Sequence, residues 1–182
     1  MTAGDVGFAA MLQRPAMPPG AAWAFVVLPK AASAKLTSRG MVTVDGTLAG
    51  VAFRATLSPD GEGGHWLKLP AALLRQAGVE AGMMADIALA PVVKEPEPRL
   101  PADLKRALAA NAAALATWRD ITATARRDWI HWITSGKQAE TRPKRIGTAI
   151  DKLAKGERRA CCFDRSGIYS RGNMGVPPAA AR

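Results

Sequence analysis

The sequence predicts an α+β protein in which a small closed six-stranded β-barrel is followed by a small all-α helical domain. Two changes along the chain lead to this prediction. In residues 1–94 apolar residues alternate over short runs separated by turn-forming residues, as in β-strands. From residue 102 onward they recur every three or four positions, as on one face of a helix. Between the two patterns lies the proline-rich segment 95–101, which we expect to be an extended linker.

The first half of the chain contains six short runs with the pattern of strands. Apolar side chains alternate over residues 8–12, and residues 23–28 are apolar on both faces, as expected inside a closed structure. Residues 41–57 contain two alternating runs, which we expect to form a hairpin. Asp45-Gly46 and Ala49-Gly50 are both candidates for its turn.

The last two expected strands enclose a short helix. Residues 66–69 form one strand, and Pro70 suits the first turn of a helix over residues 71–77. Gly78 can end this helix, and residues 83–90 form the sixth strand. Six short strands with so little helix favour a closed barrel, because closure leaves no exposed strand edge.

Residues 102–165 have the apolar spacing of a helical domain. Two short helices are expected around residues 104–108 and 115–118, with Asn111 between them. Thr122 or Thr124 can cap a third helix, which Gly136 can end, and Thr141 can cap a fourth, which Gly156 stops. Their apolar residues share one side of each helix and should face the core. These residues are Trp129, Trp132 and Ile133, then Ile146, Ala149, Ile150 and Leu153.

The positive charge is concentrated in the second half of the chain. The net charge is +10, yet residues 1–98 contain eight Lys/Arg and eight Asp/Glu. Residues 99–182 contain seventeen Lys/Arg and seven Asp/Glu, and therefore carry the whole excess. Such asymmetry predicts an anionic partner for this half of the chain, and nucleic acid is one possibility.

We expect the cations of the last helix and the segment after it to form one basic face. On a helical wheel they fall on the side opposite the apolar residues, so they are predicted to point to solvent. The candidate binding residues are Arg142, Lys144, Arg145, Lys152, Lys155, Arg158 and Arg159, with Arg126 and Glu140 shaping the site.

Arg126 and Arg142 lie within or beside the apolar sides of their helices, unlike the other cations. An unpaired buried charge is costly, so each needs a carboxylate or must extend to solvent along its aliphatic stem. Glu140 and Asp128 are the candidate partners. Alternatively, one guanidinium stays free to bind a phosphate or carboxylate through two hydrogen bonds.

No local catalytic, metal or cofactor motif is present. The sequence has no nucleophile elbow, HExxH, phosphate-binding loop or dinucleotide fingerprint, which favours a binding protein over an enzyme. His131 is expected to be an exposed helix residue, since no positioned acid or nucleophile accompanies it. The neighbouring Cys161 and Cys162 cannot form an ordinary disulfide with each other and are expected to be free thiols.

The chain has no apolar run close to the roughly 20 residues that a membrane-spanning helix needs. Its N-terminal sequence also lacks the pattern of a secretory signal. We therefore expect a cytoplasmic protein without a membrane span. Residues 166–182 are rich in Gly, Ser and Pro and are expected to form a flexible tail.

Several phrases in order resemble known domain families. LKLPAALLRQAGVEAGMMADIAL is similar to the core unit of AbrB-like, double-split β-barrels, and WAFVVLPK, SRGMVTVDGTLAG and FRATLSPDGEGGHWLKL resemble a barrel domain of unknown function. ARRDWIHWI, SGKQAETRPKRI and RRACCFDRSG resemble the YdeI/OmpD-associated helical domain, to which that barrel is commonly fused. Met83 and Ala49 depart from the pattern, in which an acid and an Asn are usual.

The resemblance implies a function in protection against bacteriocins or antimicrobial peptides, carried out without catalysis. The alternative is a nucleic-acid-binding module that uses the basic C-terminal helical hairpin. The neutral charge of the first half argues against DNA binding through the barrel. The sequence leaves the partner and the oligomeric state open.

Overall fold

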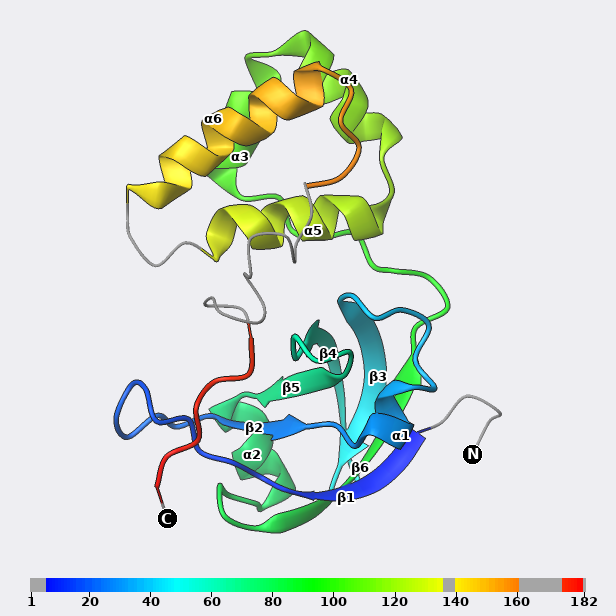
Figure 1. The fold of residues 1–182 in the computed structure, drawn as a ribbon, viewed down its shortest axis with the longest axis vertical. Coiled ribbons are helices and arrows are strands. Elements are labelled where there is room, and N and C mark those ends of the chain that lie inside the picture. The colour runs from blue at the N-terminus through cyan, green and yellow to red at the C-terminus, as the bar shows by residue number, and fades with distance from the viewer. Residues whose placement is uncertain (1–5, 136–139, 161–174, 182) are drawn as a thin grey trace. The chain divides into compact units, whose positions relative to one another are not determined.

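The computed structural model describes residues 6–135, 140–160 and 175–181. The chain forms two compact units, coloured by residue number in Figure 1. The barrel unit contains residues 1–93 together with 167–182, and the helical unit contains residues 94–166. Gly136, Cys161 and Cys162 lie outside the described residues.

Six antiparallel strands form the barrel unit, in the order β1-β6-β3-β4-β5-β2. Between β1 and β2, the two ends of this order, Gln13 and Phe25 exchange two backbone hydrogen bonds of 2.8 Å. The barrel is therefore nearly closed, which confirms the predicted fold. Its strands are β1 (Val6–Met11), β2 (Ala24–Val27), β3 (Val42–Leu48), β4 (Val51–Pro59), β5 (His65–Leu69) and β6 (Met84–Pro91).

The hairpin of β3 and β4 turns at Ala49 and Gly50, whose φ angles are +47° and +84°. Two consecutive positive φ angles suit the right-handed twist of a hairpin, although Ala is rarely found there. The other candidate, Asp45-Gly46, lies inside β3. A Cβ atom at Gly46 would lie 2.4 Å from the carbonyl oxygen of Ala88, so glycine allows β6 to pack closely against β3.

Two short helices accompany the barrel strands. Helix α2 (Ala71–Ala77) begins after Pro70 and ends at Gly78, whose φ of +64° is left-handed, as predicted. Helix α1 (Lys30–Ser33) was not predicted. The barrel encloses an apolar core contributed by every strand, with the completely or almost completely buried side chains Leu12, Val26, Leu48, Leu57, Leu67, Leu69, Ile87 and Leu89.

The helical unit contains α3 (Ala102–Ala109), α4 (Ala112–Asp120), α5 (Ala123–Thr134) and α6 (Thr141–Ala154). The predicted N-cap Thr122 is confirmed, since its side chain accepts a hydrogen bond from the amide of Ala125 at 3.2 Å. Asn111, expected between the first two helices, is the N-cap of α4 and accepts a hydrogen bond from the amide of Ala114 at 3.0 Å. Thr141 is instead the first residue of α6, whose N-terminus has no side-chain cap.

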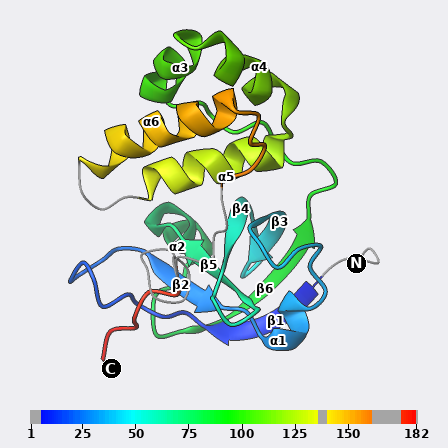
Figure 2. The ribbon, with the colours of Figure 1, turned by 45° about the horizontal axis from the view of Figure 1, so that its top comes forward.

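The tryptophans of α5 face the core of the helical unit, as predicted. Trp129 is 0% exposed and packs edge-to-face against the half-buried Trp132, with ring centroids 6.0 Å apart. Ile133 and Leu153 are also completely buried in this core. Figure 2 shows α5 and α6 lying side by side, so their apolar stripes meet.

In the described part of the chain, no helix combines the length and the apolar character needed to cross a membrane.

The C-terminal residues differ from the flexible tail expected from composition. The amide of Ala16 donates to the carbonyl oxygen of Pro178 at 2.7 Å, and the amide of Ala180 donates to that of Arg14 at 2.8 Å. The described end of the chain therefore pairs with the backbone of the barrel unit, an interaction that composition alone does not encode.

Candidate functional site

The predicted basic face lies along α6 and the segment that follows it. The structure places four of its residues on α6 and three just beyond the helix. However, four of the seven cations are bound by groups of the helical unit itself. These four are Arg142, Arg145, Lys152 and Arg158.

Arg142 joins α6 to α3. Its Nε and Nη2 atoms donate to the two carboxylate oxygens of Asp103 at 2.6 and 2.9 Å, which is the bidentate geometry that arginine favours. The sequence-based candidates, Glu140 and Asp128, are not its partners, and Glu140 is exposed. The hydrogen bond from Arg142 lowers the pKa of Asp103 to about 2, with a smaller contribution from the amide of Leu104.

The Asp103 pair predicts an acid-sensitive contribution to stability. Since the folded pKa lies below the usual 3.8, the contribution is present above about pH 4 and is lost as the pH falls toward 2. We expect Asp103→Asn to flatten this loss by less than about 1 kcal/mol, because the pair is partly exposed. Urea unfolding at about pH 5 and about pH 2.5 measures it. Asp151→Asn, at an exposed carboxylate of α6, is the matched control and should lose as much stability between the two pH values as wild type does. An equal loss in Asp103→Asn and wild type would contradict the prediction.

Arg145 caps the C-terminal end of α5. Its Nη1 atom donates to the carbonyl oxygen of Trp132 and, at 2.8 Å, to the hydroxyl of Ser135. The guanidinium also lies 5.3 Å from the centroid of the Trp132 ring, within the range of a cation–π contact. A cation at this position satisfies carbonyl groups that the helix leaves unpaired, so Arg145 holds α5 and α6 together.

Two more arginines bind the end of α4. Arg126 donates to the carbonyl oxygen of Ile121 at 2.7 Å and to Glu97 at 2.7 Å. Arg158 donates to the carboxylate of Asp120 and, at 3.1 Å, to its carbonyl oxygen. The expected partners of Arg126, Asp128 and Glu140, are therefore wrong, because the linker supplies its carboxylate instead.

The sequence also did not anticipate a cluster of charges around Arg127. Its guanidinium lies 2.7 Å from Glu95 of the linker and 3.1 Å from Asp128. All three side chains are largely shielded from water, with 12%, 16% and 18% of their areas exposed for Arg127, Glu95 and Asp128. The alternating acids of the linker, opposite in charge to Arg126 and Arg127, are the sequence feature that could have indicated this cluster.

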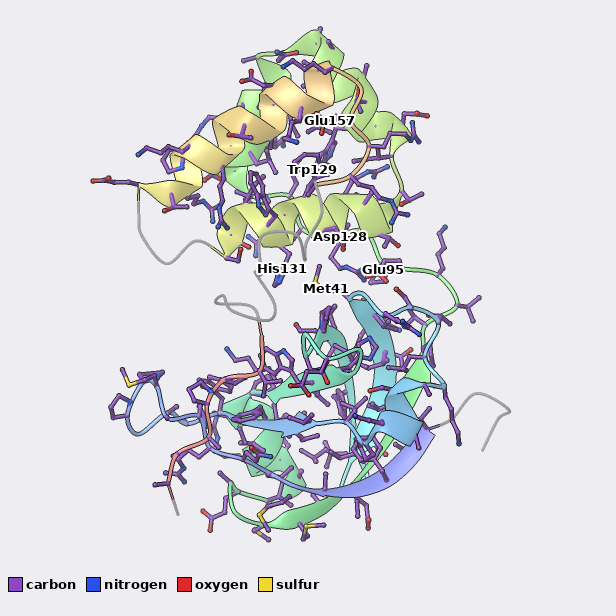
Figure 3. The ribbon with its side chains drawn as sticks, viewed as in Figure 1. Met41, Glu95, Asp128, Trp129, His131 and Glu157 are labelled. Atoms are coloured by element: carbon purple, nitrogen blue, oxygen red, sulfur yellow. The ribbon has the colours of Figure 1, made fainter. Side chains whose placement is uncertain are left out.

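Burial shifts the pKa values beside this cluster. It raises the pKa of Asp128, and the charges of Arg127 and Arg159 oppose that shift. Burial also lowers the pKa of His131, and Arg127 adds to the effect. His131 is half-buried rather than exposed as expected from the sequence. In Figure 3, Asp128 and His131 lie on the side of α5 opposite Trp129.

Lys144, Lys155 and Arg159 remain from the predicted face. In the part of the chain that the structure describes, Lys144 and Lys155 are exposed and neither forms an ion pair. Lys152 is bound to Glu157 at 2.9 Å. The usable positive surface is consequently much smaller than the sequence suggested. No group of three potential metal ligands occurs among the described residues.

The structure thus defines a two-unit α+β protein, in which a nearly closed barrel is joined to a helical bundle whose arginines mostly stabilise the bundle itself. Residues 97–156 match the family model described as Bacteriocin-protection, YdeI or OmpD-Associated. Residues 8–89 match the model for a domain of unknown function, DUF1905. The second part of the chain is therefore similar to the YdeI/OmpD-associated helical domain and the first part to the DUF1905 domain, as the sequence resemblance suggested. No curated protein matches the chain.

Proposed function

We propose that this chain is a cytoplasmic, non-enzymatic protein that protects bacterial cells against bacteriocins or antimicrobial peptides by binding a partner. The observation that carries the proposal is the match of residues 97–156 to a family described by bacteriocin protection. The arrangement of charges supports binding over catalysis. In the helical unit Arg126, Arg142 and Arg145 donate to carbonyl groups, a hydroxyl or a carboxylate of the unit itself, and a guanidinium stays protonated, so it does not serve as a general base.

The proposed contact surface is the exposed stripe of α6. Lys144, Asp151 and Lys155 are separated by seven and four residues, so they share one face of the helix. Arg159, also exposed, continues the positive charge beyond the helix. With two lysines and one aspartate the stripe is moderately positive. We infer an anionic partner whose acidic groups contact the two lysines.

Survival of a deletion strain tests this function. The strain is complemented with wild type or with Lys144→Gln/Lys155→Gln and then exposed to a panel of bacteriocins and cationic peptides. We expect deletion to lower survival, wild type to restore it and the double variant to restore it only in part, because two exposed charges contribute to binding without supporting the fold.

The matched control removes the same charge from the barrel unit. Lys30→Gln/Lys35→Gln changes two exposed lysines there and should restore survival fully. Unchanged tolerance of the deletion strain to every agent would refute protection as the function. Equal loss in both double variants would instead refute the α6 stripe as the contact surface.

A second candidate function is binding of nucleic acid, which the net charge of +10 favours. The internal pairing of Arg142, Arg145 and Arg158 weakens it, because paired cations neutralise phosphates poorly. Binding to duplex DNA over a salt series distinguishes the candidates. A steep salt dependence that Lys144→Gln/Lys155→Gln reduces would support this function, and no binding at low salt would remove it.

A further inference from the structure

The seam of the barrel unit, where β1 and β2 meet at the two ends of the strand order, has a backbone edge that the sheet itself does not pair. Gln13 pairs with Phe25 across the seam, but the three residues after it do not continue this pairing with β2. Their backbone groups instead bind residues 178–180 of the C-terminal segment. In Figures 1 and 2 this segment, coloured red, runs beside the blue chain that follows β1.

The pairing is antiparallel and uses only two amides. Pro15 and Ala179 are directly opposite each other, and the hydrogen bonds come from the amides of Ala16 and Ala180. Pro15 therefore stands where no amide donor is needed. This is the geometry by which an extended peptide adds a strand to the edge of a sheet.

The docked segment leaves a cavity unfilled beside it. The cavity has a volume of about 570 Å³, within the range of ligand sites in proteins. Residues 11–14 line one side, Ala81 and Gly82 another, and the three alanines 179–181 a third. A methyl group is the smallest side chain that can point into such a space, so the segment buries little apolar area.

The walls suit larger apolar side chains. Met11, which lines the cavity, is 37% exposed, and Ala81 adds a second apolar side chain to the lining. Methionine adapts its shape to different apolar groups, and surfaces that bind varied peptides use it for that reason. The edge supplies hydrogen bonds to any sequence, while this cavity can distinguish side chains by size.

We propose that the groove formed by residues 11–16 with Ala81 and Gly82 docks an extended segment of a partner protein, one that carries large apolar side chains in place of the alanines. The chain's own residues 175–181 are a displaceable occupant of the same edge. Two hydrogen bonds and three methyl groups bind weakly by themselves, but attachment to the same chain gives the segment a high effective concentration. A partner segment that fills the cavity gains the apolar area that the alanines forgo.

Hydrogen exchange in the full-length chain tests the docking. Ala180→Pro removes the amide that binds Arg14, so we expect the Ala16 amide to exchange at least about tenfold faster, which corresponds to about 1.4 kcal/mol. Pro178→Ala keeps the carbonyl acceptor and is the matched control, with slow exchange retained. Unchanged Ala16 exchange in Ala180→Pro would overturn the docking.

Two synthetic peptides test the cavity. One has the sequence of residues 175–182, and the other carries Ala179→Leu and Ala181→Leu, two positions on the same face of an extended strand. We expect the leucine peptide to bind the full-length Ala180→Pro chain at least about tenfold more tightly, and wild type more weakly because its own tail competes. Equal affinities of the two peptides would overturn the proposal. So would Ala16 protection that rises with protein concentration, since the occupant would then be the tail of a second copy.

Discussion

Replacement of Trp129 by alanine is expected to unfold the helical unit while the barrel unit remains folded. The indole is 0% exposed and lies among Ile133, Leu153 and the other residues of the helical core. Large aromatic residues replaced by alanine in a core typically cost about 3–5 kcal/mol, because transfer energy is lost and a cavity remains. A domain of about 70 residues rarely has that much stability to spare.

Circular dichroism at helical wavelengths during urea unfolding measures this effect. Helices α3 to α6 dominate that spectrum, so loss of the helical unit appears as a large decrease, whereas the strands contribute less. The graded control is Trp129→Phe. Within the described residues the buried indole Nε1 has no hydrogen-bond acceptor, so phenylalanine loses ring volume but no hydrogen bond. We expect it to cost clearly less than alanine, and equal losses would contradict core packing as the role of Trp129.

Local features of this fold were predictable from the sequence because their causes lie within a few residues. Asn111 and Thr122 accept hydrogen bonds from amides three positions ahead, and Gly78 adopts the left-handed conformation that ends a helix. The apolar stripes of α5 and α6 follow from helical periodicity alone. The same periodicity placed Trp129 in the core.

The partners of the arginines were not predictable in this way. Asp103 lies 39 residues from Arg142, and Glu97 lies 29 residues from Arg126. A helical wheel shows which side of a helix a cation occupies, but not which carboxylate or carbonyl group another helix brings to it. The internal pairing of the predicted basic residues therefore depended on tertiary structure, which the sequence pattern does not encode.

The docked tail shows the same limit for backbone contacts. Residues 166–182 are rich in Gly, Ser and Pro, a composition that suggests no packed structure. The pairing of the tail depends on main-chain groups of Arg14 and Ala16, which become available only once the barrel seam has formed. Side-chain patterns carry no information about such an edge.

Replacement of Arg127 by methionine is expected to destabilise the helical unit strongly at neutral pH. Methionine fills similar space, so the main loss is charge. Without the guanidinium, Glu95 and Asp128 remain as two largely shielded carboxylates that have lost the cation between them. Breaking a buried ion pair by removing one partner typically costs about 3–5 kcal/mol.

The pH dependence distinguishes this mechanism from lost packing. Burial already raises the pKa of Asp128, and loss of Arg127 removes the first of the charges that oppose this shift. An acid whose folded pKa lies above its unfolded value destabilises the fold as the pH rises through that interval, and the penalty disappears below it. The variant should therefore lose most stability near pH 7 and recover toward about pH 4, as measured by urea midpoints across this range.

Two further variants complete the experiment. Arg119→Met removes an exposed arginine at the end of α4 and should change stability by no more than about 0.5 kcal/mol. Arg127→Met/Glu95→Gln also removes the negative charge of one of the two carboxylates that Arg127 contacts, and should recover part of the lost stability at pH 7. A loss that is the same at both pH values, with no recovery in the double variant, would mean that Arg127 acts through its aliphatic stem. The linker would then be held to α5 by packing rather than by its carboxylates.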